Sequence, residues 1–191
     1  MSYRLKNTWH QSDRNQPSVK TSKDNAKAIA YIIWRLSLEG AKKLHGEGFE
    51  YLSDPERIGV INEYLAFLVQ STDRLIFEHM ADEDRGTFMN IVGHQLAEQV
   101  QDNLLDIAGP GNYCRPFIAM LNERFSDYAT LSFEEEQPGY DFLRYFGDRV
   151  LRTMPTNQTN RWVIDQVMDV EAPFVLKKLK ESIENLMGKG G

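Results

Sequence analysis

The sequence predicts an all-α protein, a single-domain bundle of about six or seven helices. Apolar residues recur at three- and four-residue spacing along most of the chain, which is the periodicity of helices that pack on one face. No strand-like alternation bounded by hairpin turns interrupts this pattern, and no repeat suggests a solenoid. The length of 191 residues, with 41% apolar and 26% charged residues, suits one ordinary globular domain.

Charge divides the chain into a basic N-terminal segment and an acidic body. Residues 1–27 carry six Lys or Arg and two Asp, a net charge of +4, whereas the remainder carries sixteen basic and twenty-six acidic residues, a net charge of −10. Residues 1–20 lack apolar periodicity and are predicted to form a flexible basic arm, followed by the all-α domain over 21–188. An acidic body repels phosphate backbones, which argues against nucleic acid as the main partner.

A first helix is predicted to follow residues 1–20. Ser22 can cap its N-terminus, and Gly46 and Gly48 stop it. His45 falls in the last turn, where a positive charge complements the exposed carbonyls, so a capping role is favoured over a ligand role. The apolar residues at helical spacing are Ile29, Ile32, Ile33, Leu36 and Leu44.

The second helix is predicted over about 54–80 and has the clearest start in the sequence. Ser53 supplies a cap, Pro55 suits the first turn and Glu56 faces the positive end of the helix dipole. Residues 64–69 are apolar on all sides, which is typical of a helix buried between its neighbours. We therefore expect this helix to be the buried centre of the fold.

A short acidic connection leads to a third helix over about 84–108, so the second and third helices should form an antiparallel hairpin. A fourth helix is predicted over about 117–130. Residues 132–135 have the form of a capping box, but Pro138 follows closely, so one acidic turn and then a break are expected.

Two more helices are predicted in the C-terminal third. One covers about 140–154, and the next begins after a cap at Thr156 or Asn157. Pro173 either kinks that helix or opens a seventh, which carries an apolar stripe. Such a C-terminal stripe usually packs on its own domain, although it also suits the face of a homodimer.

Catalytic and metal-binding motifs are absent from the sequence, and no cofactor is implied. There is no Gly-x-Ser-x-Gly elbow, Walker loop, His-Glu-x-x-His or pair of Glu-x-x-His motifs. Cys114 is the single cysteine; Arg115 could lower its pKa and make it reactive, but an inert thiol is the favoured interpretation. With no disulfide framework, signal sequence or membrane-length apolar run, a cytoplasmic location is expected.

One group of polar residues deserves a structural test. If the second and third helices pair in antiparallel fashion, Asp73 and Thr72 come level with His94, and Glu98 shares a face with His94. The favoured interpretation is that Asp73 and His94 hydrogen-bond and fix the helix register, since buried charges must be paired. Alternatively, Asp73, His94 and Glu98, with Thr72 beside them, open into a pocket that binds a metal or a small polar ligand.

Two functional hypotheses from different classes follow. The first is a non-enzymatic interaction or regulatory protein, homodimeric through helix faces, that engages an acidic or helical protein partner. The second is a helical-bundle protein, either a binding protein or an enzyme, with a ligand or metal site between the second and third helices. A helical bundle by itself favours neither one.

Overall fold

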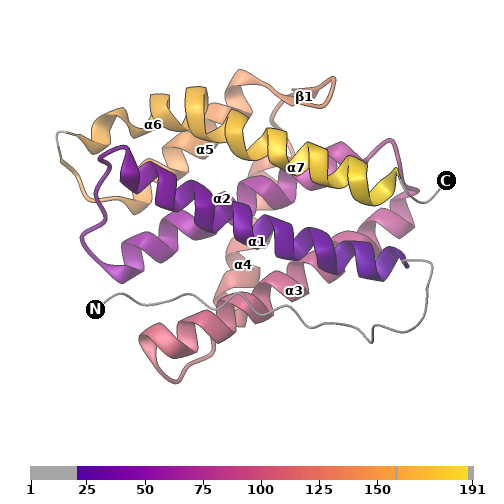
Figure 1. Cartoon of the computed structure of the whole chain (residues 1–191), viewed down its shortest axis with the longest axis horizontal. Helices are drawn as coiled ribbons and strands as arrows, with labels where there is room; N and C mark the ends of the chain where they lie inside the picture. The colour runs from indigo at the N-terminus through magenta and orange to yellow at the C-terminus, as the bar shows by residue number, and fades with distance from the viewer. Residues whose placement is uncertain (1–20, 158, 189–191) are drawn as a thin grey trace.

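The computed structural model describes residues 21–157 and 159–188, and it confirms the all-α bundle (Figure 1). The prediction of a flexible arm over 1–20 concerns residues outside this range. In the part of the chain that is described, no helix combines the length and apolar character needed to cross a membrane. The elements are α1 (Ser22–Gly46), α2 (Asp54–Ile76), α3 (Asp82–Ala108), α4 (Cys114–Tyr128), β1 (Phe133–Glu134), β2 (Gln137–Pro138), α5 (Tyr140–Thr153), η1 (Asn160–Trp162), α6 (Val163–Gln166), η2 (Val167–Glu171) and α7 (Ala172–Met187).

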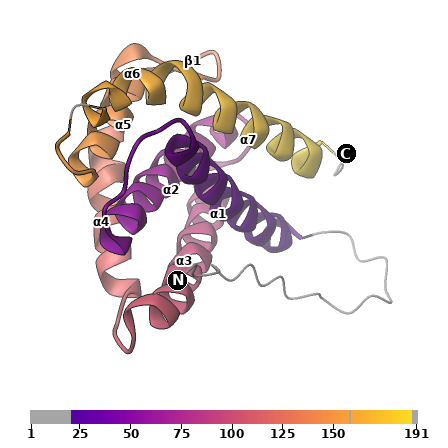
Figure 2. The same ribbon diagram turned by 60° about the vertical axis from the view of Figure 1, so that its left-hand side comes forward.

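Helix α2 is the centre of the bundle, as its all-round apolar sequence predicts. It packs against α1, α3, α4, α5 and α7, and every residue from Tyr64 to Thr72 is buried. Helix α1 lies between α7 and α3 in both views of the molecule (Figures 1 and 2). Helices α2 and α3 are in contact, as expected, but α3 packs more extensively on α1 than on α2. The three helices α1, α2 and α3 therefore pack together, and α2 and α3 do not form an isolated hairpin.

Local capping explains where the first two helices begin. Thr21, and not Ser22, caps α1. Its side chain accepts a hydrogen bond from the backbone N–H of Asp24, and the Asp24 carboxylate accepts one from the backbone N–H of Thr21. Ser53 and Glu56 form the same reciprocal box at the start of α2, as predicted. Helix α2 ends at Ile76 and not near residue 80, because the chain already turns toward α3 there.

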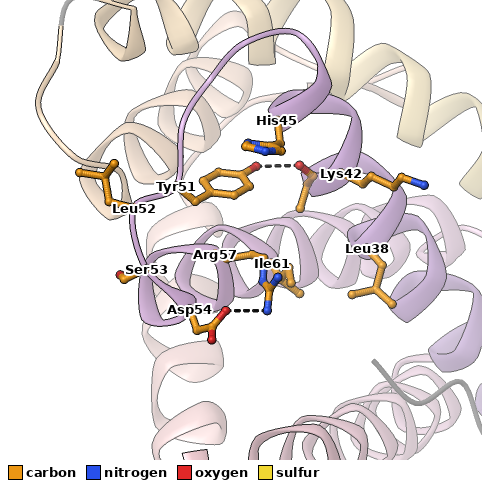
Figure 3. A pocket seen from close by; sticks show the side chains of 10 residues that line it. Leu38, Lys42, His45, Tyr51, Leu52, Ser53, Asp54, Arg57 and Ile61 are labelled. Carbon is orange, nitrogen blue, oxygen red and sulfur yellow. Dashed lines mark hydrogen bonds and ion pairs between the residues drawn. The ribbon is translucent and has the colours of Figure 1, made fainter. Parts of the chain in front are cut away.

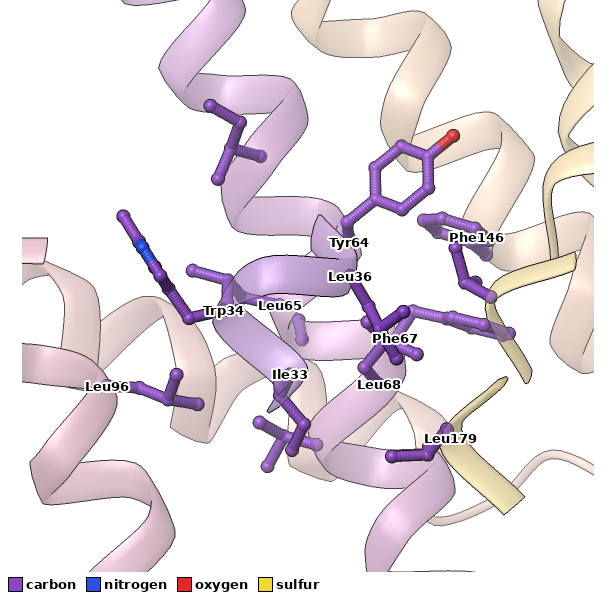
Figure 4. Close-up of a cluster of buried hydrophobic side chains, with 14 of the residues drawn as sticks. Ile33, Trp34, Leu36, Tyr64, Leu65, Phe67, Leu68, Leu96, Phe146 and Leu179 are labelled. Carbon is purple, nitrogen blue, oxygen red and sulfur yellow. The ribbon is translucent and has the colours of Figure 1, made fainter. Parts of the chain in front are cut away.

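Aromatic side chains fill the core between α2 and α5 (Figure 4). The rings of Phe67 and Phe146 stack with centroids 4.2 Å apart, and Tyr64 meets Phe146 edge-on at 5.0 Å. Tyr64 also lies against Gly40 of α1, where a Cβ atom would come within 2.4 Å of the ring. Gly40 therefore allows the close approach of α1 to α2.

A buried ion pair crosses this core. Arg124 of α4 donates two hydrogen bonds to the carboxylate of Glu63 on α2, at 2.9 and 2.8 Å, and both side chains are 4% exposed. Arg149 of α5 approaches the same carboxylate at 3.4 Å. The Glu63 hydrogen bonds raise the pKa of Arg124, so its guanidinium stays charged at any ordinary pH.

The C-terminal third differs from the prediction in two places. Residues 133–138 form a two-stranded hairpin and not an acidic helical turn, because Glu135 and Glu136 adopt left-handed backbone angles that end any helix. The predicted sixth helix is a 3₁₀ turn, one short α turn and the π turn η2. Pro173 then lies in the first turn of α7, so it opens the seventh helix, and the backbone N–H of Ala172 reaches back to Val167.

Candidate functional site

The polar group expected between α2 and α3 does not form. His94 and Glu98 are exposed on α3, and Asp73 pairs with Arg85 at 2.6 Å. Thr72 is buried, but its hydroxyl donates to the Leu68 carbonyl within its own helix at 2.8 Å. The prediction that His94 and Asp73 meet in one polar layer is therefore wrong.

The reason is the rotation of α3. Its buried face contains Phe88, Val92, Leu96 and Val100, spaced by four residues, together with Gly93, Ala97 and Asn103. His94 lies two positions from both Val92 and Leu96, which places it on the opposite side of the helix. Within the described residues, no cluster of three or more His, Cys, Asp or Glu side chains could hold a metal ion, so the proposed ligand set of Asp73, His94 and Glu98 gains no support.

Cys114 lies at the start of α4 and donates a hydrogen bond through its thiol to the Ala97 carbonyl at 3.3 Å. Burial raises its pKa, and the carboxylates of Glu98 and Asp102 add to the effect. The expectation that Arg115 could lower this pKa is wrong, because burial raises it and the nearby carboxylates raise it further. Cys114 is thus a poor nucleophile.

A pocket of about 620 Å³ lies where the end of α1 meets the start of α2 (Figure 3). The connection between the two helices forms one wall. Side chains of three kinds line it: aliphatic groups, one tyrosine and several charges. The lining residues are Leu38, Ala41, Lys42, His45, Tyr51, Leu52, Ser53, Asp54, Arg57 and Ile61.

Tyr51 fixes the wall of this pocket to α1. Its hydroxyl donates to the Ala41 carbonyl at 2.7 Å, and its ring stacks on the His45 ring with centroids 5.3 Å apart. His45 lies in the last turn of α1, and its Nδ1 is 3.0 Å from the Phe49 carbonyl in the connection. Burial, and then the charge of Glu171, raises the pKa of Tyr51 above its usual range, so it remains a neutral aromatic surface.

Asn160 attaches the connection to a segment far away in sequence. Its side chain accepts a hydrogen bond from the backbone N–H of Glu50 at 3.1 Å and donates to the Glu50 carbonyl at 3.2 Å. A further hydrogen bond reaches the Pro155 carbonyl at 3.0 Å. Asn160 is fully buried, so these bonds are shielded from water and hold the two segments in one arrangement.

Two large apolar side chains flank this attachment and face solvent. Leu52 is 71% exposed and Trp162 is 57% exposed. Each lies two residues from the Glu50 and Asn160 pair, at most about 7 Å along the chain. Leu52 belongs to the pocket wall itself, whereas Trp162 is outside the lining and is joined to the α1–α2 connection through Asn160. We refer to these two exposed side chains as the apolar rim.

The pocket is positive in a chain whose net charge is −6. Lys42, His45 and Arg57 face it, and Asp54 is the one carboxylate in its lining. Arg57 lies 2.7 Å from Asp54, yet its buried Nε has no hydrogen-bond acceptor in the described structure. The positive end of the α2 dipole lies at the same place. An anionic group would find the positive charges of Lys42 and Arg57 here.

The sequence contained part of this site. Lys42 and His45 at the end of one predicted helix, and Arg57 one turn into the next, are joined by a short connection that must bring them together. The roles of Tyr51 and Asn160 were missed, because their contacts with Ala41 and Glu50 follow from tertiary packing and have no local pattern.

Comparison with known proteins identifies no relative: no protein-family model, curated protein or solved structure matches this chain. The functional argument therefore depends on the pocket and its rim.

Proposed function

We propose that this is a non-enzymatic interaction protein whose α1–α2 pocket binds a carboxylate-bearing, apolar segment of a protein partner. The observation that carries the proposal is a pocket of about 620 Å³ in which the cationic side chains of Lys42 and Arg57 outnumber the single carboxylate of Asp54, with Leu52 exposed in its wall.

The charges favour a carboxylate. Arg57 and Lys42 provide an ionised donor on each side of the pocket. Hydrogen bonds from a guanidinium to a carboxylate are about twice as strong as those between neutral groups. The neutral ring of Tyr51 and the side chains of Leu38 and Ile61 offer an apolar surface for the rest of the ligand.

The rim favours a protein over a free small molecule. Leu52 in the pocket wall and Trp162 on the segment joined to it by Asn160 are both exposed, and a ligand confined to the pocket would leave much of their surface in water. Exposed aromatic and aliphatic groups beside a structured pocket are typical of the central residues of protein interfaces. Asn160 holds both segments in place, which lowers the entropy lost on binding.

A second candidate is a small anionic ligand with no protein attached. The volume of about 620 Å³ supports it, since small-molecule sites commonly measure about 300–1,000 Å³. The two candidates differ in whether binding uses the rim. Binding of a small ligand should depend on Arg57 and Lys42 but not on Trp162, whereas binding of a protein segment should depend on all three.

A peptide panel tests the proposal. Short acetylated and amidated peptides with a phenylalanine beside adjacent glutamates are titrated against the wild type, Arg57→Gln, Lys42→Gln and Trp162→Ala, together with their glutamine counterparts. Arg144→Gln and Lys177→Gln are matched controls, because both residues are exposed and outside the pocket lining. Binding should require the glutamates, weaken at least tenfold in all three site variants, and be unchanged in the controls.

Loss of binding in Arg57→Gln and Lys42→Gln with full binding in Trp162→Ala would favour the small-ligand candidate. Equal binding of the glutamate and glutamine peptides would exclude recognition of a carboxylate at this pocket.

A further inference from the structure

The hairpin formed by β1 and β2 presents an exposed acidic tip. Phe133 pairs with Pro138 and Glu134 with Gln137, which leaves Glu135 and Glu136 as a two-residue turn. Their φ angles of 48° and 59° belong to the turn type that normally uses Asn-Gly. All three consecutive glutamates, Glu134 to Glu136, are exposed. Two of them, Glu135 and Glu136, occupy turn positions whose backbone angles glutamate rarely adopts.

The base of this hairpin is firmly attached to α5. The Ser132 carbonyl accepts a hydrogen bond from the Gly139 backbone at 2.8 Å, and the Ser132 backbone N–H donates to Asp141 at 2.9 Å. The ring of Phe133 meets Phe142 edge-on at 5.4 Å. The acidic tip is thus a projection held in one conformation and not a free loop.

Within the tip, Glu134 and Glu135 are the carboxylates available to a partner. Glu136 lies 3.9 Å from Lys180 of α7, so part of its charge is balanced inside the chain. For Glu134 and Glu135, no ion pair with another described residue is formed. The tip offers two free carboxylates, the charged group that the α1–α2 pocket is proposed to accept, while Phe133 packs inward on Phe142.

The pocket and the hairpin of one chain do not meet. In Figure 1 the hairpin lies at the upper edge beside α7, whereas the α1–α2 connection lies at the left end. No hairpin residue lines the pocket. An acidic tip and a cationic pocket on separate parts of one surface can satisfy each other only between two molecules.

We propose that the acidic hairpin of one copy, through Glu134 and Glu135, binds the α1–α2 pocket of a second copy, at Lys42 and Arg57. This inference rests on the proposed function and names its partner as the chain itself. The contact joins two different patches; if it forms twice, once in each direction, it closes into a symmetric dimer.

Electrostatics sets the conditions for this contact. A net charge of −6 on each copy opposes their approach, but charges separated by more than about 8 Å are screened at physiological salt. The local attraction between the tip and the pocket acts at much shorter range. Self-association should therefore be moderate in strength, and high salt should weaken it.

Sedimentation velocity at increasing protein concentration tests the contact. The variants are a hairpin variant, Glu134→Gln with Glu135→Gln, and a pocket variant, Lys42→Gln with Arg57→Gln. Glu181→Gln with Glu184→Gln on α7 makes the same change of charge at two other exposed positions and is the control. Circular dichroism confirms that each variant keeps its helices.

The decisive sample is an equal mixture of the hairpin and pocket variants. Each alone should remain monomeric at concentrations where the wild type and the control associate. The mixture should regain a 1:1 complex, since one molecule keeps an intact hairpin and the other an intact pocket.

Three results would overturn the inference: a wild type that stays monomeric, a hairpin variant that associates like the wild type, or a mixture that forms no complex. A second titration separates failure of self-association from failure of the proposed function. In it, the acidic peptides are added to the hairpin variant, whose pocket is intact. Peptide binding without self-association leaves the pocket as a site for another protein, whereas absence of both removes the two proposals together.

Discussion

Asn160 and Glu50 are 110 residues apart in sequence, yet the Asn160 side chain bonds both the N–H and the carbonyl of Glu50. The amide thereby pairs with the backbone as a neighbouring strand would. This relationship joins the α1–α2 connection to the segment that precedes α6, and it sets the position of the Leu52 and Trp162 rim. The fixed arrangement of the proposed binding surface therefore depends on one buried side-chain amide, that of Asn160.

Replacement of Asn160 tests this role. Asn160→Ala leaves the Glu50 backbone groups without partners in a buried place, so the free energy of unfolding should fall by about 1–3 kcal/mol. Peptide binding at the pocket should weaken as well. Asn185→Ala is the control, because its side chain bonds only the Glu181 carbonyl on an exposed helix face. Urea unfolding measures the first effect and titration the second, and a neutral Asn160→Ala would contradict the account.

The buried pair of Glu63 and Arg124 should be costly to break on one side only. Glu63→Gln leaves the charge of Arg124 buried without its main partner, and a loss of about 3–5 kcal/mol is expected. Arg152→Ala removes an exposed ion pair with Asp148 and should cost at most about 1 kcal/mol. Urea unfolding of both variants checks the contrast. Equal effects would mean that Glu63 is not desolvated as the structure shows.

Replacement of glycine by alanine should have opposite effects on stability at Gly40 and at Gly86. A Cβ at Gly40 would come within 2.4 Å of the Tyr64 ring, so Gly40→Ala should destabilise the protein by about 1–3 kcal/mol. Nothing lies within 4 Å of a Cβ at Gly86 in α3, so Gly86→Ala should stabilise by about 0.5–1 kcal/mol through helix propensity. Thermal unfolding compares the two. Stabilisation by Gly40→Ala would refute the close α1–α2 contact.

Asp141 should make stability depend on acid pH. Its hydrogen bonds from Ser132, first from the hydroxyl and then from the backbone N–H, lower the pKa of its carboxyl below the ordinary 3.8. A carboxyl with a lowered folded-state pKa contributes stability above its unfolded pKa and loses that contribution as pH falls through the folded value. Asp141→Asn should thus be less stable than the wild type at about pH 6, and the difference should shrink toward about pH 3. A difference that does not change with pH would show that the charge of Asp141 contributes nothing.

Much of the fold could be predicted because its signals are local. Ser53, Pro55 and Glu56 mark the start of α2 through their own backbone contacts, and the all-round apolar sequence of Tyr64 to Val69 requires burial. Thr21 was missed as a cap by a single residue, since Ser22 satisfies the same local pattern. The hairpin was missed because Glu135 and Glu136 are residues that rarely occupy left-handed turns.

The candidate site could be predicted only in part, because helix rotation is a tertiary property. The periodicity of α3 allows more than one buried stripe, and the expected site required His94 to face inward with Ile91 and Ala97. Packing on α1 selects the stripe that contains Val92 and Leu96, which turns His94 outward. Asn160 offers no local signal at all, since its partner lies at Glu50.

Isothermal titration of one acidic peptide tests the central claim most directly. A peptide with a phenylalanine beside two glutamates is titrated into the wild type, Arg57→Gln and Arg144→Gln under identical conditions. The account predicts saturable binding to the wild type and Arg144→Gln, at least tenfold weaker binding to Arg57→Gln, and loss of affinity at high salt. Equal affinity for all three proteins, or no binding to the wild type, would contradict the assignment of the α1–α2 pocket as the recognition site.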